Sequence, residues 1–354
     1  MAKTNYLEKQ QRPGEELDLQ KLLPWIQQHL PKVNDIPVIT QFTGGASNWT
    51  YRLQFKQQDL ILRRAPLGKK AAGAHNMPRE FHLQQKLKPH YSYVPEMIAV
   101  CEDESILGST FYLMERLDGV ILRKNFPKTI NWNATTIREM CYSFWDKMIE
   151  LHQIDYKQQG LDTLGKGEGY IERQITGWNK RYTNAKTWNV PSGKKVIKWL
   201  EENMPKETKL CVIHNDFRLD NVVIDAANPK NIFGVLDWEL AAIGDPLMDL
   251  GNSLAYWVED NDDFFVKSIR RQPSNAVGML TRKEVIAYYC KKTNRTIDDF
   301  RFYRIYSLFR LAGIVQQIYY RYSKGYTKNK AFKNFWLISW YLIKNCENVI
   351  KKGT

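Results

Sequence analysis

The sequence contains little that would point to a secreted, disulfide-rich or membrane-spanning protein. Its five cysteines form no C-x-x-C pair, which argues against a disulfide framework or zinc ribbon and favours a reducing compartment. The first residues are polar and hold no apolar signal core. The most apolar run, residues 335–343, has about half the length that a bilayer-crossing helix needs. We therefore expect a cytoplasmic protein with no membrane partner.

Motifs of several other protein classes are absent as well. The chain has no G-x-x-x-x-G-K-[ST] loop, no internal repeat and no low-complexity tract. Residues 164–170 (LGKGEGY) are rich in glycine, but no strand clearly precedes them, so we interpret them as a mobile loop rather than a phosphate-binding fingerprint. The chain is long enough for a two-lobed globular protein with a sizeable core, since it has 354 residues with ordinary apolar and charged fractions.

Positive charge is concentrated in the last quarter of the chain. The formal net charge is +14, and residues 266–354 alone hold 19 Lys and Arg against 4 Asp and Glu. Such a region attracts anionic partners and repels cationic ones. A solvated, lysine-rich helix surface explains the same charges equally well. No recognised nucleic-acid-reading module accompanies them, so we expect no nucleic-acid partner.

The first part of the chain, residues 1–117, has the pattern of a small antiparallel sheet with helices. Asp18 is suited to cap a helix over residues 19–30, which contains Pro24 and ends at Pro31. A second helix is predicted at residues 78–87, with a proline in its first turn. Alternating or aromatic-rich patterns predict five strands, at residues 38–42, 49–55, 60–64, 97–101 and 110–116.

Residues 118–354 are expected to form a larger, mainly helical lobe. The pair Asp118-Gly119 marks the crossing into it. Apolar residues at helical spacing predict helices at residues 135–154, 196–203, 246–258, 282–292, 297–322 and 330–350. A β-hairpin with loops interrupts the helices near residues 214–239. The expected fold class is therefore α+β.

The most informative segment places two acids and one carboxamide between short apolar runs. Asp216 can accept a proton from a hydroxyl group, and Asn221 and Asp237 offer hard oxygen donors that suit Mg²⁺. Phosphoryl transfer depends mainly on positioning, metal and charge neutralisation. The protein-kinase catalytic loop uses the same Asp-to-Asn offset and a later metal-binding Asp. A turn-capping role explains any one of these residues alone, but the three together favour catalysis.

Residues 214–221 (HNDFRLDN) and 235–239 (VLDWE) resemble the signature of the aminoglycoside phosphotransferase, or choline-kinase-like, family. The resemblance continues in residues 41–51 (QFTGGASNWTY), 62–64 (LRR), 79–81 (REF), 111–116 (FYLMER) and 244–250 (GDPLMDL). It implies a protein-kinase-like, two-lobed fold with ATP and Mg²⁺ as cofactors. Residues 63–68 (RRAPLG) and 236–240 (LDWEL) are most similar to the family branch associated with acyl-CoA dehydrogenases. That branch is thought to phosphorylate hydroxyacyl-CoA thioesters.

The resemblance also implies nucleotide-binding residues. Arg63 stands where the family usually has lysine, and it would clamp phosphates and pair with Glu80. Arg64 competes for this role, since strand alternation lets only one of the two face the site. Backbone groups of Glu115 and Leu117 would meet the adenine edge. A glycine-containing turn would cover the phosphates with Gly44, Gly45, Ser47 and Asn48.

Other polar residues are assigned to the acceptor or to structural support. The candidates for binding the acceptor are Tyr170, Arg173, Trp178, Arg181, Glu239 and Arg310. For several of them, packing of one helix against its neighbour is an equally good explanation. By resemblance, His214 would hold the catalytic loop and Asp249 would brace it from a helix.

These features together predict an ATP- and Mg²⁺-dependent small-molecule O-phosphotransferase. Its acceptor is expected to be a hydroxyacyl-CoA or a related hydroxy acid, and the branch resemblance implies a functional pairing with an acyl-CoA dehydrogenase. One alternative is an aminoglycoside or amino-alcohol kinase, whose cationic acceptors the basic C-terminal region would repel. Another is a pseudokinase that binds nucleotide without chemistry. ATP and GTP are not distinguished by the sequence.

Overall fold

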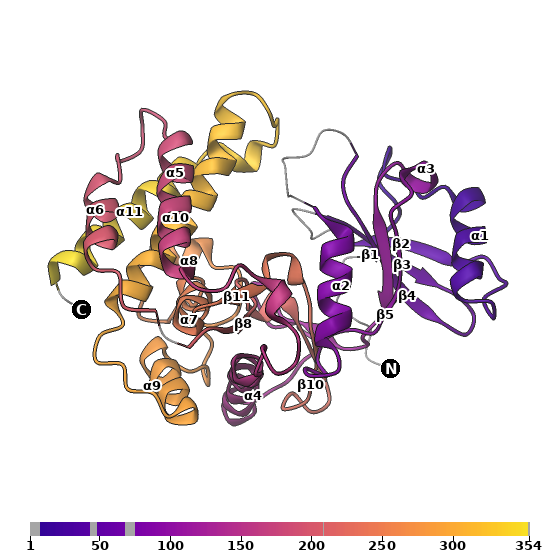
Figure 1. Cartoon of the computed structure of the whole chain (residues 1–354), viewed down its shortest axis with the longest axis horizontal. Coiled ribbons are helices and arrows are strands. Elements are labelled where there is room, and N and C mark those ends of the chain that lie inside the picture. The colour runs from indigo at the N-terminus through magenta and orange to yellow at the C-terminus, as the bar shows by residue number, and fades with distance from the viewer. Residues whose placement is uncertain (1–7, 43–47, 68–74, 208, 353–354) are drawn as a thin grey trace. The chain divides into compact units, whose positions relative to one another are not determined.

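The structure, a computed structural model, describes residues 8–42, 48–67, 75–207 and 209–352 (Figure 1). The chain divides into two units. The sheet unit comprises Met1–Ser143 and Leu219–Leu240, and the helical unit comprises Phe144–Arg218 and Ala241–Thr354. The predicted lobe boundary between residues 117 and 118 stays a prediction, whereas the structure groups the 219–240 segment with the first part of the chain.

The sheet unit is built on an antiparallel sheet with strand order β1-β2-β3-β4-β6-β5. Its strands are β1 (Glu8–Lys9), β2 (Val38–Phe42), β3 (Trp49–Gln54), β4 (Asp59–Arg64), β5 (Met97–Cys101) and β6 (Phe111–Glu115). The five predicted strands are confirmed, and the two-residue β1 extends the sheet at one edge. In the β4–β6 register, Arg63 lies opposite Tyr112 and Arg64 lies opposite Phe111.

Helices α1 (Leu19–His29) and α2 (Met77–Leu87) also match the prediction closely. Asp18 caps α1 by accepting hydrogen bonds from the N–H groups of Gln20 and Lys21. Asn76 caps α2 in the same way from the N–H of Arg79. A short helix, α3 (Glu104–Leu107), was not predicted.

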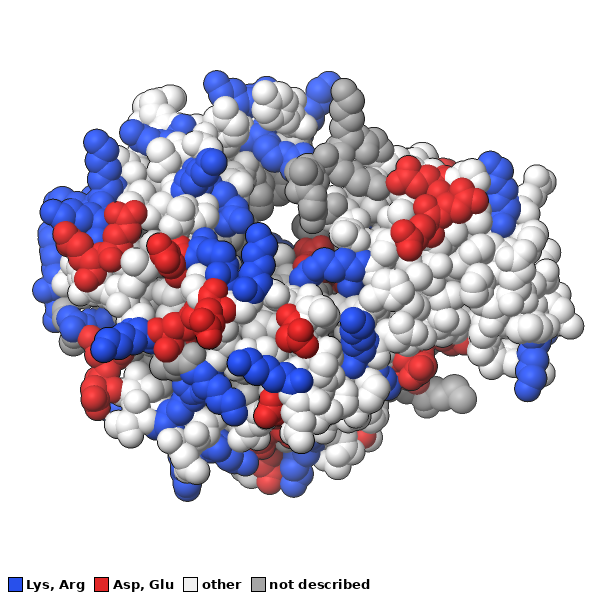
Figure 2. Space-filling model, in the orientation of Figure 1, with Lys and Arg blue, Asp and Glu red and all other residues white. Residues whose placement is uncertain are grey.

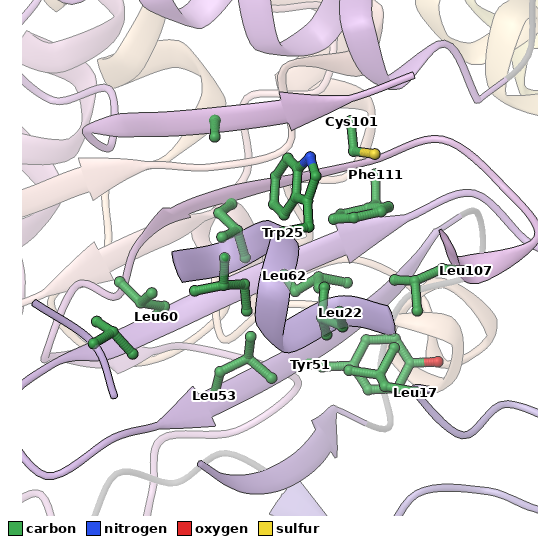
Figure 3. Close-up of a cluster of buried hydrophobic side chains, with 14 of the residues drawn as sticks. Leu17, Leu22, Trp25, Tyr51, Leu53, Leu60, Leu62, Cys101, Leu107 and Phe111 are labelled. Atoms are coloured by element: carbon green, nitrogen blue, oxygen red, sulfur yellow. The ribbon is translucent and has the colours of Figure 1, made fainter. Parts of the chain in front are cut away.

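One core of the sheet unit lies between α1 and the sheet (Figure 3). Trp25 of α1 makes an edge contact with Phe111 of β6, with ring centroids 4.8 Å apart. Other buried members come from β3, β4 and β5, among them Tyr51, Leu53, Leu60, Leu62 and Cys101. These contacts explain the aromatic and alternating patterns of the strands, because one face of each is buried.

The sheet unit also contains the hairpin that the sequence predicted around the catalytic patch. Strands β9 (Val222–Ile224) and β10 (Ile232–Val235) pair antiparallel, and β9 also pairs with β7 (Val120–Ile121). A 3₁₀ turn, η2 (Leu219–Asn221), leads into β9, and another, η3 (Trp238–Leu240), follows β10.

The helical unit is mainly α-helical, as predicted. The division between the units falls inside α4 (Ala134–Gln153). The remaining elements are η1 (Asp162–Leu164), α5 (Tyr170–Asn184), α6 (Lys194–Glu202), β8 (Cys211–Ile213), β11 (Ala242–Gly244), α7 (Pro246–Ala255), α8 (Phe264–Ile269), α9 (Arg282–Thr293), α10 (Arg301–Ser323), η4 (Lys330–Phe332) and α11 (Phe335–Lys352). The long helix α10 packs against α11, α7 and α5. Helices α5 and α8 were not predicted, and α10 and α11 begin four or five residues later than expected.

Two global expectations can be compared with the described residues. None of their helices is long and apolar enough to cross a membrane. On the face drawn in Figure 2, Lys and Arg are interspersed with Asp and Glu rather than gathered into one continuous patch.

Candidate active site

The β9–β10 hairpin brings the two predicted metal ligands to the same end of one element. Val222 pairs with Val235, and the N–H of Leu236 donates to the carbonyl of Asn221 at 2.8 Å. Asn221 immediately precedes β9, and Asp237 is the second residue after β10. The backbone of Asp237 is left-handed, with φ of 68°, a conformation that Asp and Asn adopt more readily than most residues.

Arg63 of β4 links the hairpin to α2. Its Nη2 donates to Oδ1 of Asp237 at 2.9 Å, and its Nη1 lies 3.4 Å from Oε1 of Glu80. The hydroxyl of Tyr112 donates to the same Glu80 oxygen at 3.0 Å. Burial alone would lower the pKa of Arg63, but the charges of Glu80, Tyr112 and Asp237 outweigh it and hold that pKa well above its usual value. Arg63 is therefore a permanently charged centre between two acids.

Arg64 points to the opposite face of the sheet. Its guanidinium donates to the carbonyls of Leu107 and Glu15 at 3.2 and 2.9 Å and lies 4.7 Å from the centre of the Trp49 ring. Because neighbouring strand residues alternate between faces, only Arg63 joins Glu80 and Asp237. Arg63 is thus the arginine that joins the candidate site, and its role as a phosphate clamp stays a prediction.

The predicted phosphate-covering turn is described only at its end. Gly44, Gly45 and Ser47 lie outside the described residues. Asn48 is buried, and its Nδ2 donates to Oε2 of Glu239 at 3.2 Å, while its Oδ1 lies 2.8 Å from Nδ1 of His75. Arg79 donates to the carbonyl of Glu239 at 3.1 Å. Glu239, predicted as an acceptor residue, thus lies beside the predicted nucleotide-binding residues of the sheet unit.

The predicted adenine-binding segment lies against the hairpin. The N–H of Glu115 donates to the carbonyl of Glu96 at 2.9 Å. Leu117 packs against Gly234 of β10. A Cβ added at Gly234 would lie 2.1 Å from a methyl carbon of Leu117 and 3.0 Å from the carbonyl oxygen of Tyr93. Glycine at residue 234 therefore permits the close approach of this segment to β10.

In the helical unit, Asp249 of α7 organises the loop that precedes the proposed base. Its carboxylate accepts hydrogen bonds from the backbone N–H groups of His214 and Asn215 at 2.9 and 2.7 Å. Its Oδ2 also lies 3.0 Å from Nε2 of His152. Burial would raise the pKa of Asp249, but these hydrogen bonds and the two histidines outweigh it and hold the pKa below its usual value. The brace is thus an ionised, fully buried carboxylate.

His214 and Asp216 are connected within the loop. The N–H of Asp216 donates to Nδ1 of His214 at 3.2 Å. Such a contact is what a loop-holding role requires, and the role itself stays a prediction. The carboxylate of Asp216 is 3.1 Å from Nε of Arg218, whose guanidinium lies 4.6 Å from the centre of the Tyr256 ring.

The acceptor candidates of the helical unit lie on α5 and α10. Trp178 is close to both Arg181 and Arg310, with distances of 4.6 and 5.5 Å from each guanidinium carbon to the ring centroid. The hydroxyl of Tyr170 donates to Oδ1 of Asn215 at 3.2 Å. Arg173 is placed differently, because it donates to the carbonyls of Gly167 and Glu168 and so ties down the glycine-rich segment.

Three residues of this arrangement were not predicted. Arg218 could have been found, since it follows the proposed base by two residues and carries the opposite charge. His152 and Asn252 gave no local signal, because they contact Asp249 and Asn215 from distant parts of the chain. The structure therefore gathers Arg63, Glu80 and Asp237 in the sheet unit, with Asn221 at the same hairpin end, while Asp216 belongs to the helical unit.

Comparisons with known proteins agree with this description. The model of the phosphotransferase enzyme family (APH) matches residues 38–284, and the chain belongs to this family. It is 33% identical over 324 residues to acyl-CoA dehydrogenase family member 11 of Rattus norvegicus, covering 88% of this chain and 41% of that protein. It is 33% identical over 290 residues to acyl-CoA dehydrogenase family member 10 of Mus musculus, covering 81% and 27%. The chain thus spans well under half the length of these relatives.

Solved structures give the same fold. A candidate aminoglycoside phosphotransferase from Ralstonia eutropha has a TM-score of 0.75 and 29% identity, with 93% of this chain and 99% of that one covered. Choline kinase from Cryptosporidium parvum has a TM-score of 0.65 at 15% identity, with 95% and 97% covered. An aminoglycoside phosphotransferase solved with AMP-PNP and hygromycin B has a TM-score of 0.59 at 15% identity, with 93% and 98% covered. The protein therefore has the kinase-like fold of the phosphotransferase family to which it belongs.

Proposed function

We propose that the protein transfers the γ-phosphate of ATP to the hydroxyl group of a hydroxyacyl-CoA or a related hydroxy acid. The observation that supports phosphoryl transfer most directly is the network of Arg63, Glu80 and Asp237 at the open end of the β9–β10 hairpin. A charged, well-oriented guanidinium can bind two phosphate oxygens at once. An aminoglycoside phosphotransferase of the same fold binds the ATP analogue AMP-PNP.

The donor set at the hairpin end suits Mg²⁺. Asp237 offers a carboxylate and Asn221 a carboxamide oxygen, both hard donors. No group of three or more His, Cys, Asp and Glu residues that could hold a metal occurs within the described parts of the chain. Mg²⁺ typically takes one or two protein ligands and completes its shell with water and phosphate oxygens. When bound, the ion would neutralise charge on the nucleotide phosphates.

The proposed reaction uses Asp216 as proton acceptor. The acceptor hydroxyl gives its proton to a carboxylate oxygen of Asp216, and its oxygen forms a bond to the γ-phosphorus. The bond from that phosphorus to the β-phosphate oxygen breaks, and ADP leaves. The ion pair with Arg218 helps to hold the carboxylate of Asp216 in position.

The acceptor assignment rests on sequence similarity. The relatives at 33% identity are acyl-CoA dehydrogenase family members, whereas the choline kinase and the antibiotic-bound phosphotransferase share only the fold at 15% identity. We propose on the same ground that the protein acts together with an acyl-CoA dehydrogenase.

The test combines one variant with an acceptor panel. Asp216→Asn should lower kcat by about a hundredfold or more, since proton transfer and orientation are both lost, while the Kd for ATP stays near the wild-type value. Asp225→Asn is the control, because it neutralises a partly exposed acid in the connection between β9 and β10. Near-normal turnover of Asp216→Asn would remove the base assignment. Turnover of choline or an aminoglycoside, with none of hydroxyacyl-CoA, would favour the cationic-acceptor alternative, and ATP binding without turnover of any acceptor would favour a pseudokinase.

A further inference from the structure

Two arginines share one indole ring in the helical unit. Arg181 and Trp178 belong to α5, and Arg310 belongs to α10. Both guanidinium groups lie within cation–π distance of the Trp178 ring. The indole itself is held against α10, since a Cβ at Gly313 would come within 3.0 Å of it. The ring thus brings two positive charges to one small region of the helical unit.

Neither arginine is neutralised by a carboxylate among the described residues. Arg310 is only 5% exposed. Its one side-chain hydrogen bond to a described residue runs from Nη2 to the carbonyl of Asn215 at 3.1 Å. Arg181 is exposed and makes no ion pair with any described acid. A buried cation without a counter-ion is costly, and such charges are normally paired. An anion supplied by a ligand would provide the missing partner.

The carbonyl that Arg310 binds belongs to the residue directly before the proposed base. Asn215 is fixed from several sides: its N–H donates to Asp249, and its side-chain oxygen accepts from Tyr170 and from Asn252 at 3.1 Å. Its backbone is left-handed, with φ of 67°. Arg310 is therefore anchored to the backbone of the residue that directly precedes Asp216.

The tyrosines around the cluster lie in the field of the same charges. The pKa of Tyr306 is raised to about 12 by burial, while the positive charges of Arg310 and Arg181 act to lower it. The buried hydroxyl of Tyr306 thus lies within the electrostatic field of both guanidinium groups. A phenol hydroxyl, an indole and two guanidinium groups together provide donors and a flat apolar wall, which suits an anionic oxygen group attached to a carbon chain.

We propose that Arg181, Trp178 and Arg310 form an anion-binding subsite that recognises the negatively charged group of the phosphoryl acceptor. The inference rests on the proposed function for the identity of the reaction, and it adds the residues that select an anionic acceptor. Two sources carry the required chemistry: a carboxylate of a free hydroxy acid and a phosphate of coenzyme A. The subsite would exclude polycationic acceptors by repulsion.

Arg181 gives the sharpest test, because it is exposed and its removal should not disturb folding. Arg181→Gln is compared with Lys180→Gln, which removes an exposed charge from the next residue of α5. Losing a charge-assisted hydrogen bond should raise KM for an anionic acceptor about tenfold, with kcat nearly unchanged. Arg181→Glu should raise KM further, and Lys180→Gln should leave it near the wild-type value.

Three acceptors separate the two sources of negative charge. The same hydroxyacyl group is offered as its coenzyme A thioester, as its uncharged N-acetylcysteamine thioester, and as the free hydroxy acid. A KM increase confined to the coenzyme A thioester identifies a phosphate as the bound group. An increase confined to the free acid identifies a carboxylate. Equal KM values for wild type and Arg181→Glu with all three acceptors would overturn the proposal.

A binding measurement makes the result independent of turnover. Isothermal titration calorimetry with free coenzyme A and with the free hydroxy acid is performed on the wild type, Arg181→Glu, Arg310→Lys and Arg310→Gln. The subsite is supported if Arg181→Glu binds the ligand more weakly than the wild type and Arg310→Lys binds it more tightly than Arg310→Gln. This support holds even if no acceptor is phosphorylated. In that case only the proposed function fails. Binding that is unchanged in every variant, or absent in the wild type, overturns the subsite.

Discussion

Two carboxylates, Asp237 in the sheet unit and Asp249 in the helical unit, are held in different ways. Asp237 has a side chain that is 32% exposed and is bound by the long side chain of Arg63. Asp249 is fully buried and is bound by two backbone N–H groups and a histidine. A flexible side-chain partner can be exchanged for another ligand, whereas backbone donors cannot move without the loop. Asp237 is thus suited to changing partners and Asp249 to holding one arrangement.

Removing Asp249 should have the largest effect. Asp249→Ala leaves two buried N–H groups and His152 without their acceptor, so we expect a loss of about 3–5 kcal/mol in the free energy of unfolding. Urea unfolding followed by circular dichroism measures it. Asp298→Asn, which removes an exposed acid from the same unit, is the control and should change stability little. A loss below about 1 kcal/mol for Asp249→Ala would show that the brace is weaker than its geometry indicates.

Arg63 should contribute less to stability and more to nucleotide binding. Arg63→Gln leaves Glu80 buried without a cation, which should cost about 2–3 kcal/mol and weaken the binding of ATP at least tenfold. Arg63→Lys keeps the charge but not the forked geometry, so it should recover part of both losses. Calorimetric titration with ATP and Mg²⁺ gives the affinities. Equal ATP affinity in all three proteins would contradict the clamp assignment.

The fit of Leu117 over Gly234 predicts an intermediate effect. Gly234→Ala should cost about 1–3 kcal/mol, because the new methyl group cannot be accommodated beside Leu117 and the Tyr93 carbonyl. It should also weaken nucleotide binding if the segment at residues 115–117 meets adenine. The double variant Gly234→Ala/Leu117→Ala should recover part of the stability in a double-mutant cycle. Simple additivity of the two single changes would disprove this coupling.

The smallest expected effect is a pH dependence. The pKa of Asp249 is lower in the folded protein than its ordinary value of 3.8. The carboxylate therefore stabilises the fold fully above about pH 4, and this contribution is lost as the pH falls through the folded-state pKa, by about 1.4 kcal/mol for each unit of depression. The stability difference between wild type and Asp249→Asn should shrink as the pH falls below about 4. A constant difference down to pH 3 would contradict this origin.

Local sequence patterns predicted the sheet and most helices because residues within each of these elements determine its secondary structure. The strands of the sheet unit show alternation or aromatic enrichment, and α1 and α2 carry their own capping residues. Helix α5 was missed because its start is stabilised from far away. The N–H groups of Gly169 and Tyr170 donate to Glu207, and no side chain near Gly169 caps the helix.

The same distinction applies to the candidate site. The offsets between Asp216, Asn221 and Asp237 are a local signal, and the hairpin that carries the last two was predicted. The pairing of Arg63 with Asp237 and of His152 with Asp249 joins residues far apart in the sequence, so it follows only from the fold. Arg63 and Arg64 could not be separated before the strand register was known, since both are basic and adjacent.

The left-handed backbone at Asn215 and Asp237 places a second demand on these two positions. Each must satisfy an unusual main-chain conformation as well as present an oxygen, and glycine meets the first requirement while failing the second. Alanine replacement would mix conformational strain with loss of the side chain. For mutational studies and for design on this scaffold, glycine is therefore the cleaner deletion at both positions, and an Asn–Asp exchange is the change that preserves shape while altering charge.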